Sequence, residues 1–398
     1  MGRNMPPLPY DFKDHVEINV NFMYFFGIMR PKLDTKLENF LHNVRVAVLS
    51  GFMFGGIMSA ELANLYYSFG DLEQLMRALF LTLSNLVSIA KFHAVWRNQR
   101  RILDLIDAMN VAALRPRSGR QLAALGRYAR LGKALTLGCA GAVTATCAFW
   151  AVYPFTDDDG PFLPIPAYVP FDVRNSTFRF ALVYSFEIVA TAVGGQMDLA
   201  ADCLMAVLLM TFCAQLNVLN DSLVNLQPME TNRTKSLVKN MNEKLVHCIR
   251  QHRLIIEFTE TWSGMFTYAI FSQFVVSVFV ICATFFEMTQ VPASSIRFFS
   301  MALYQMCMFL EIYPICYYGN EVIKESDKLT DSAYHCDWSE CPLEFQKNLV
   351  FFMTRSQRPI KLYAGNFFAL SLETFIKILK SSWSFVAVLI QVNNDKID

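Results

Sequence analysis

The sequence predicts an all-α membrane protein with seven transmembrane helices, a cytoplasmic N-terminus, an extracellular C-terminus and helical extensions on the cytoplasmic side. Three observations lead to this fold class: the composition, seven apolar stretches of membrane-spanning length, and a one-sided distribution of Lys and Arg. Of the 398 residues, 54% are hydrophobic and only 17% are charged, whereas about 25% of the residues of an average soluble domain are charged. This composition indicates a chain that lies mostly in lipid.

Seven stretches are long and apolar enough to cross the membrane, because a bilayer core of about 30 Å needs about 20 apolar residues in a helix. Backbone groups in lipid must find their hydrogen bonds within their own segment, so each stretch is predicted to be helical. No low-complexity linker divides the chain, and we expect one membrane domain over residues 1–398. The predicted spans cover residues 44–66, 75–96, 129–153, 180–215, 262–286, 296–318 and 365–392.

Lys and Arg residues orient these spans. The N-terminal segment and the loops 97–130, 217–259 and 319–361 together hold 25 of them, whereas the other loops and the tail hold only Arg174 and Lys396. Cytoplasmic loops carry the excess of Lys and Arg, so the N-terminus is predicted in the cytoplasm and the C-terminus outside.

The hydrophilic stretches after the second, fourth and sixth spans are predicted to continue as amphipathic helices. After the sixth span, Phe345, Leu349 and Phe352 recur at helical spacing, and Arg358-Pro359 then ends the pattern. The apolar faces of such helices need partners, which we expect to be each other or another subunit.

Two glycosylation sequons test the orientation. Asn175 starts one in a loop assigned to the outside, and Asn232 starts the other in a basic loop assigned to the cytoplasm. We expect glycan on Asn175 alone.

Catalytic and nucleic-acid functions find no support in the sequence. It contains no nucleophile elbow, phosphate-binding loop or zinc-protease motif, so we expect no catalytic residues and no cofactor. His335, Cys336 and Cys341 are too loosely spaced for a zinc site, and we expect no metal. A net charge of +1 lacks the basic surface that nucleic acid requires.

The last apolar stretch carries the most specific pattern in the chain. Residues 371–385 read SLETFIKILKSSWSF. With seven spans, a cytoplasmic N-terminus and a proline break before the last helix, this tail resembles the closing helix of the insect odorant receptor family. The loop 217–259 lacks the extended insertion of the family's co-receptor, so the chain resembles a tuning receptor.

The resemblance implies a function and partners. It implies an odorant-sensing subunit of a ligand-gated, non-selective cation channel in the plasma membrane of sensory dendrites. The subunit would assemble with the olfactory co-receptor as a hetero-oligomer, a tetramer, through its cytoplasmic helices. The last helix would line the pore and narrow it at Val388, Gln391 and Val392.

The residues of the last stretch support a pore-lining helix on their own. At 100° per residue, the side chains within about 60° of Val388 are mostly polar and the opposite side is mostly apolar. The polar stripe ends in an apolar step at Val388 and Val392, which we expect to close the pore by dewetting, with Gln391 as a polar contact for cations. The stripe comprises Glu373, Thr374, Lys377, Ser381, Ser384, Phe385, Gln391 and Val392.

Lys377 and Lys380 lie deep in this stretch. An ionisable group at the centre of a bilayer costs roughly 2.5–3.5 kcal/mol, so a water-filled lumen explains them better than lipid does. Glu373 stands four residues before Lys377, the favourable order for an ion pair on a helix.

The resemblance also implies a ligand site, in the outer half of the bundle between the second, third, fourth and sixth spans. A volatile ligand needs an apolar, aromatic cavity with one or two polar groups. Tyr184, Tyr304 and Thr146 would supply the orienting hydrogen bond to an odorant, for which an aromatic or phenol-like compound is one candidate. The candidates at helical spacing are Met76, Leu79, Phe80, Leu83, Val143, Thr146, Trp150, Tyr184, Ile188, Met301, Tyr304 and Gln305.

Three acidic residues interrupt the fourth apolar stretch. Glu187, Asp198 and Asp202 either line a water-filled groove or form inward-facing polar pairs that join helices, and we favour the pairs.

Other seven-helix functions remain open alternatives. A gustatory-type receptor channel shares the predicted plan. A G-protein-coupled receptor requires the opposite orientation, and a secondary transporter requires matching broken spans in two halves, which Gly194-Gly195 alone does not supply.

Overall fold

The protein is almost entirely helical. The computed structural model describes residues 8–31, 35–70, 72–155, 163–165, 168–171, 173, 176–226, 235–336, 338–339 and 341–394. A two-residue hairpin, β1 (Tyr363–Ala364) with β2 (Phe368–Ala369), is the one sheet in these ranges. A π-helical turn (Gly51–Ile57) and a 3₁₀ turn (Tyr153–Phe155) accompany the α-helices, which are α1 (Lys13–Phe25), α2 (Lys36–Ser50), α3 (Met58–Tyr67), α4 (Leu72–Ala108), α5 (Gly119–Val152), α6 (Thr177–Val224), α7 (Lys235–Thr289), α8 (Ile296–Tyr334), α9 (Leu343–Ser356) and α10 (Leu372–Asn394).

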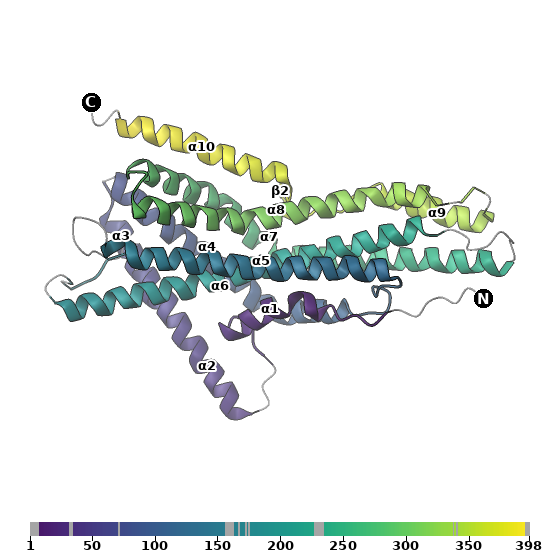
Figure 1. Cartoon of the computed structure of the whole chain (residues 1–398), viewed down its shortest axis with the longest axis horizontal. Coiled ribbons are helices and arrows are strands. Elements are labelled where there is room, and N and C mark those ends of the chain that lie inside the picture. Colours follow the sequence, from purple (N-terminus) through teal and green to yellow (C-terminus); the bar gives the residue numbers. More distant parts are fainter. Residues whose placement is uncertain are drawn as a thin grey trace.

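Seven helical segments are long and apolar enough to cross a membrane, and they match the seven predicted spans one for one. The first is built from α2, the π-helical turn and α3, and the other six are single helices (Figure 1). The predicted class of seven-helix membrane protein is therefore confirmed. The segments are Lys36–Tyr67, Gln74–Ala108, Gly119–Val152, Thr177–Val224, Met241–Thr289, Ile296–Tyr334 and Leu372–Val392.

The predicted start of the last span at residue 365 is wrong, because the helix begins at Leu372. Gly365 and Asn366 both have positive φ angles, 58° and 63°, a conformation that Gly and Asn adopt more readily than other residues. The chain therefore turns here and pairs β1 with β2 before α10 starts. Leu370, at the end of this hairpin, is fully buried, and a Cβ atom added to Gly319 of α8 would lie 2.5 Å from its Cβ. Hydropathy alone missed the break because the turn is as apolar as the helix after it.

The predicted helical extensions are present. The helices α4, α6, α7 and α8 each continue beyond the predicted spans, and α9 lies beside α7 and α8 at the end of the molecule opposite to the C-terminal end of α10 (Figure 1). The predicted stripe of α9 is buried, with Phe345, Leu349 and Phe352 at most 2% exposed. Its other face leaves Phe351 and Val350 exposed, so the extension keeps an apolar surface that its own chain does not cover.

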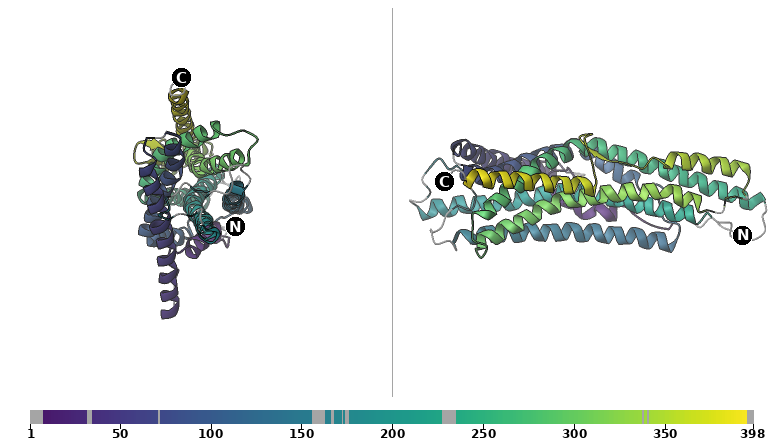
Figure 2. Two further views of the ribbon diagram at one scale, coloured as in Figure 1. Left: turned by 90° about the vertical axis from the view of Figure 1, so that its left-hand side faces the viewer. Right: turned by 90° about the horizontal axis from the view of Figure 1, so that it is seen from above.

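The helix α6 occupies the centre of the bundle. Its most apolar window is 100% buried, compared with 17% for α10. It packs against α1, α5, α7 and α8, and the view along the bundle shows these helices around it (Figure 2). Small residues permit the contact with α5, where a Cβ added to Gly132 would lie 3.3 Å from Val207. A helix surrounded on all sides can be apolar all round. The acidic residues of α6, Glu187, Asp198 and Asp202, therefore need partners inside the protein.

The helix α2 leaves the bundle and projects away from it (Figures 1 and 2). Its start is set by a capping box, in which Thr35 Oγ1 accepts the Glu38 N–H at 3.1 Å and Glu38 Oε2 accepts the Thr35 N–H at 3.2 Å. Phe40 and Val48 on this helix are more than 60% exposed. An exposed apolar helix of this kind is covered by lipid in a membrane.

Candidate ligand cavity and pore helix

A cavity lies between α4, α5, α6 and α8, with Ile57 and Glu61 of the first span at its edge. These four helices are the second, third, fourth and sixth spans. The space open to the centre of a water molecule is about 90 Å³, several times the 10–15 Å³ that one water needs on this measure. The cavity is therefore large enough for a small organic molecule.

Aromatic rings form one wall of the cavity. The rings of Trp150 (α5) and Tyr304 (α8) stack with centroids 5.5 Å apart, and Phe80 (α4) meets the Tyr304 ring edge-on at 5.3 Å. Leu81 and Met308 add aliphatic and sulfur surface to the lining. An apolar and aromatic lining with a few polar groups is the usual character of a small-molecule site.

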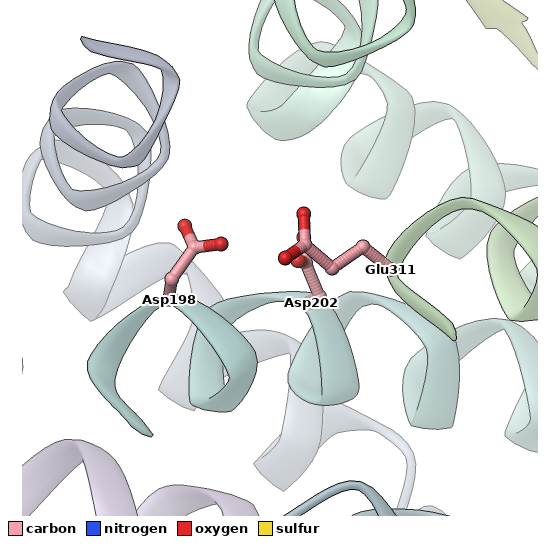
Figure 3. A group of neighbouring side chains, drawn as sticks. All are labelled: Asp198, Asp202 and Glu311. Carbon is pink, nitrogen blue, oxygen red and sulfur yellow. The ribbon is translucent and has the colours of Figure 1, made fainter. Parts of the chain in front are cut away.

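Part of the polar lining, Asp198 and Glu311, belongs to a buried ion cluster. Lys91 Nζ on α4 lies 2.9 Å from Asp198 Oδ2 and 2.7 Å from Asp202 Oδ2 on α6, and 3.4 Å from Glu311 Oε2 on α8. Gln273 on α7 donates to Asp202 and Glu311, both at 3.4 Å. Figure 3 shows the three carboxylates converging from α6 and α8. Four helices therefore meet at one polar point inside the membrane domain.

This cluster explains how ionised groups are tolerated at that depth. Lys91 is 1% exposed, and an unpaired buried ammonium in a bilayer is costly, whereas a paired and hydrogen-bonded one is tolerated. The carboxylate oxygens of Asp198, Asp202 and Glu311 lie within 4.8 Å of one another, and the Lys91 ammonium supplies the cation among them. The preference for helix-joining pairs at Asp198 and Asp202 is confirmed. Glu187 is also buried, and one of its oxygens accepts the Ile165 N–H at 3.3 Å.

Each of the three predicted hydrogen-bond donors already has a partner within the protein. The Tyr304 hydroxyl lies 2.8 Å from Ser84 Oγ, and the Thr146 hydroxyl donates to the Ala142 carbonyl at 2.9 Å. The Tyr184 hydroxyl donates to the carbonyl of Ala151. Hydroxyl donors are therefore largely engaged before any ligand arrives.

The structure brings only some of the predicted ligand residues together. Val143, Thr146, Trp150 and Tyr304 line the cavity. Phe80 does not line the cavity but packs against the ring of Tyr304, which does. The remaining seven residues are not part of the lining, and among them Gln305 is buried with no partner on either side-chain polar atom in the described structure. These seven are Met76, Leu79, Leu83, Tyr184, Ile188, Met301 and Gln305.

Sequence reasoning missed most of the polar lining. Ser84, Asn85 and Ser88 on α4 follow one another at helical spacing and all face the cavity. Two further residues could have been identified from the sequence, Lys91, one turn after Ser88, and Glu311. Both are ionisable residues inside apolar stretches, and such residues mark functional or paired positions. Neither residue reveals its partner in the sequence, because the partners lie on other helices.

The last helix, α10, presents two different faces. It packs against α7 and α8 through a stripe that includes Ile378, Ser382 and Val386, each at most 6% exposed. Val388 is 57% and Val392 43% exposed, and Ser384 and Gln391 are exposed as well. The proposed pore residues therefore lie on the uncovered face.

One residue of the predicted polar stripe lies elsewhere. Thr374 is 7% exposed, and its hydroxyl donates to the Ala369 carbonyl at 2.7 Å. It belongs to the junction between the hairpin and the helix. The predicted ion pair is present on the exposed face, with Lys377 Nζ 2.7 Å from Glu373 Oε1. Lys380 is exposed close to it.

The asparagine of each sequon lies outside the described residues. Asn175 and Asn232 fall in the gaps before α6 and α7, so glycan on Asn175 stays a prediction.

The fold defines a multi-pass membrane protein of seven helices. The family model described as 7tm odorant receptor matches residues 71–383, and the chain belongs to this odorant receptor family. Membership of a receptor family confirms that the protein is not an enzyme.

Several members of the family are similar over different lengths. Odorant receptor 94a of Drosophila melanogaster is 29% identical over 238 residues, which cover 59% of this chain and 60% of that protein. Odorant receptor 2a of Drosophila melanogaster is 25% identical and covers 92% of this chain, with 93% of its own length matched. Odorant receptor Or1 of Anopheles gambiae is 20% identical, with 96% of each chain covered.

Solved structures of the insect olfactory receptor OR5 from Machilis hrabei share the fold. The complex of that receptor with eugenol superposes with a TM-score of 0.82, covering 96% of this chain and 98% of that one at 17% identity. Its second structure gives a TM-score of 0.77 at 17% identity, with 95% and 100% covered.

We predict that Lys91→Met destabilises the folded protein by about 3–5 kcal/mol, because three buried carboxylates then lack their cation. Surface expression and the thermal transition of the detergent-solubilised protein measure the effect. Lys13→Met is the matched control, since the Lys13–Asp107 pair is more than half exposed and such pairs contribute about 0–1 kcal/mol. Equal behaviour of the two variants would contradict a structural role for the cluster.

Proposed function

We propose that this protein is the odorant-sensing subunit of a ligand-gated, non-selective cation channel that assembles with the olfactory co-receptor. The observation that carries the proposal is the pairing, in one chain, of an internal cavity with a last helix whose exposed face carries Lys377, Ser384 and Gln391 among apolar side chains. Membership of the odorant receptor family supports it. The short loop between α6 and α7 favours a tuning receptor over a co-receptor, and the plasma membrane of sensory dendrites is its expected location.

The proposed ligand is a small volatile molecule with an apolar body, for which an aromatic ring is one candidate. The stacked rings of Trp150 and Tyr304 form a flat wall that suits an aromatic ring. The receptor OR5, which has the same fold, was solved with eugenol, a phenol. Val143, Thr146, Trp150 and Tyr304 are the residues that we propose for contact with the ligand.

The proposed pore lies along the uncovered face of α10. A face that carries Lys377, Ser384 and Gln391 is poorly suited to lipid, and α10 of other subunits around a water-filled axis would cover it. This requires an oligomer, for which we propose a tetramer with the co-receptor. The apolar surface of α9 around Phe351 is suited to contacts between subunits on the cytoplasmic side.

The helix α8 offers a direct mechanical link between the cavity and the pore. It lines the cavity through Tyr304, Met308 and Glu311. Two residues after Glu311, the Tyr313 ring meets the Phe375 ring of α10 edge-on at 5.5 Å. We propose that a ligand held in the cavity shifts α8, and that α8 then moves the base of α10 so that Val388 and Val392 separate.

Filling the cavity should reduce sensitivity to the odorant. A Cβ added to Gly195 would lie only 3.0 Å from Val143, so a larger side chain at position 143 must enter the cavity. We expect Val143→Phe to raise the half-activating concentration roughly tenfold or more, which is about 1.4 kcal/mol, at equal surface expression. Leu137→Phe is the control because Leu137, on the same helix, is 57% exposed. A normal dose response in Val143→Phe would remove the cavity as the ligand site.

Changes at the apolar step should alter conduction without a ligand. We expect Val388→Ser to increase the leak current of the co-expressed complex, because a hydroxyl helps water to enter a closed apolar constriction. Gln391→Arg should lower cation permeability by placing positive charge in the path. Ile376→Ser is the control and should conduct as the wild type does, because Ile376 is 49% exposed but lies about 120° from Val388 around α10. Unchanged conduction in both pore variants would exclude this face from the pore.

Assembly is tested by recording membrane currents with and without the co-receptor. We expect odorant-evoked cation currents, without added nucleotide or G protein, only when both chains are expressed. A response that requires a G protein would contradict the channel proposal.

A further inference from the structure

The ion cluster beside the cavity has more acidic than basic groups. Three carboxyl groups, of Asp198, Asp202 and Glu311, surround one ammonium, that of Lys91. Asp198 and Glu311 also line the cavity, as does Glu61, and the described residues of the lining include neither Lys nor Arg. A ligand in this cavity therefore meets hydrogen-bond acceptors at its polar end.

The donors of the cluster are already used. An ammonium group has three N–H donors, and the Lys91 ammonium contacts one oxygen of each of the three carboxylates. The Gln273 amide donates to Asp202 and Glu311 but not to Asp198. Asp198 consequently has one hydrogen bond, and its Oδ1, like Asp202 Oδ1, has no partner among the residues that the structure describes.

Asp198 and Asp202 differ in access to the cavity although they share a helix and a partner. The side chains of Asp198 and Glu311 are 12% and 16% exposed and both line the cavity, whereas that of Asp202 is 4% exposed and does not. The terminal torsion of an Asp side chain is broad, so either oxygen of Asp198 can turn toward a donor in the cavity. A buried carboxylate oxygen without a donor is costly, and a ligand donor would remove that cost.

We infer that Asp198, with Glu311 beside it, is the polar subsite of the cavity and accepts a hydrogen bond from a hydroxyl or amino group of the ligand. The inference rests on the proposed function and specifies its ligand: a compact apolar body with an O–H or N–H donor at one end. The body lies against Trp150 and Tyr304, and the donor points toward the ion cluster. Hydroxyls of the protein play the smaller part because Tyr304 and Thr146 are already hydrogen-bonded.

The test compares ligands of one shape that differ only at the polar end. Cells expressing this chain with the co-receptor are recorded against straight-chain, branched and aromatic skeletons, each ending in a hydroxyl, an amino group or a methyl group. The aromatic set is 2-phenylethanol, 2-phenylethylamine and propylbenzene. We expect the hydroxyl or amino member of an activating set to be roughly ten- to a hundredfold more potent than the methyl member. The comparison of alcohol with amine shows which donor the subsite prefers.

Two variants with the same change of charge identify the contact. In Asp198→Asn, the amine should lose roughly ten- to a hundredfold in potency, the alcohol less because an amide oxygen still accepts, and the methyl compound nothing. Asp202→Asn alters the same cluster by the same charge but does not reach the cavity, so the order of potency should stay as in the wild type. Surface expression is measured for both.

Three results would overturn the inference. Equal potency of the methyl and donor-bearing members would exclude a polar subsite while leaving the odorant-gated channel intact. An equal loss of amine potency in Asp202→Asn and Asp198→Asn would assign the effect to the charge of the cluster and not to contact with Asp198. Silence of the whole set, in cells where both chains reach the surface, would contradict the proposed function together with the subsite.

Discussion

An ammonium buried among three carboxylates holds the middle of this membrane bundle together. Lys91 joins α4 to α6 and α8, and Gln273 adds α7. Ionised groups at this depth are tolerated only when their partners are in place, so four helices must take up one mutual arrangement. The ligand cavity adjoins this ion cluster, because Asp198 and Glu311 belong to the cluster and also line the cavity. The packing of the bundle and the polarity of the cavity therefore depend on the same few atoms.

The second constraint is the unequal surface of α10. One side packs on α7 and α8, and the other carries Lys377, Ser384 and Gln391 without cover from its own chain. The Glu373 carboxylate, 2.7 Å from the Lys377 ammonium, partly compensates the positive charge on that face. The face is still unsuitable for contact with lipid. Such a helix is complete only in an assembly, which links the single chain to the oligomer that we propose.

Much of the architecture was predictable from the sequence. Hydropathy located all seven spans, and the Lys and Arg count oriented them, since both signals are local and lipid imposes them directly. Hydropathy placed the start of the last span wrongly at residue 365, because Gly365 and Asn366 turn the chain inside an apolar run. Four predicted ligand residues line the cavity and the others do not, because helical spacing gives a face but not the rotation of each helix against its neighbours.

The sequence by itself determined the class of protein, and it predicted the orientation and the polar stripe along the last helix. It also marked Asp198 and Asp202 as residues in need of partners. Only the tertiary structure decided that the partner is Lys91, that Glu311 shares it, and that Asp198 faces a cavity while Asp202 does not. The physical reason is distance along the chain: burial and periodicity act within a helix, whereas an ion pair between helices depends on how those helices pack.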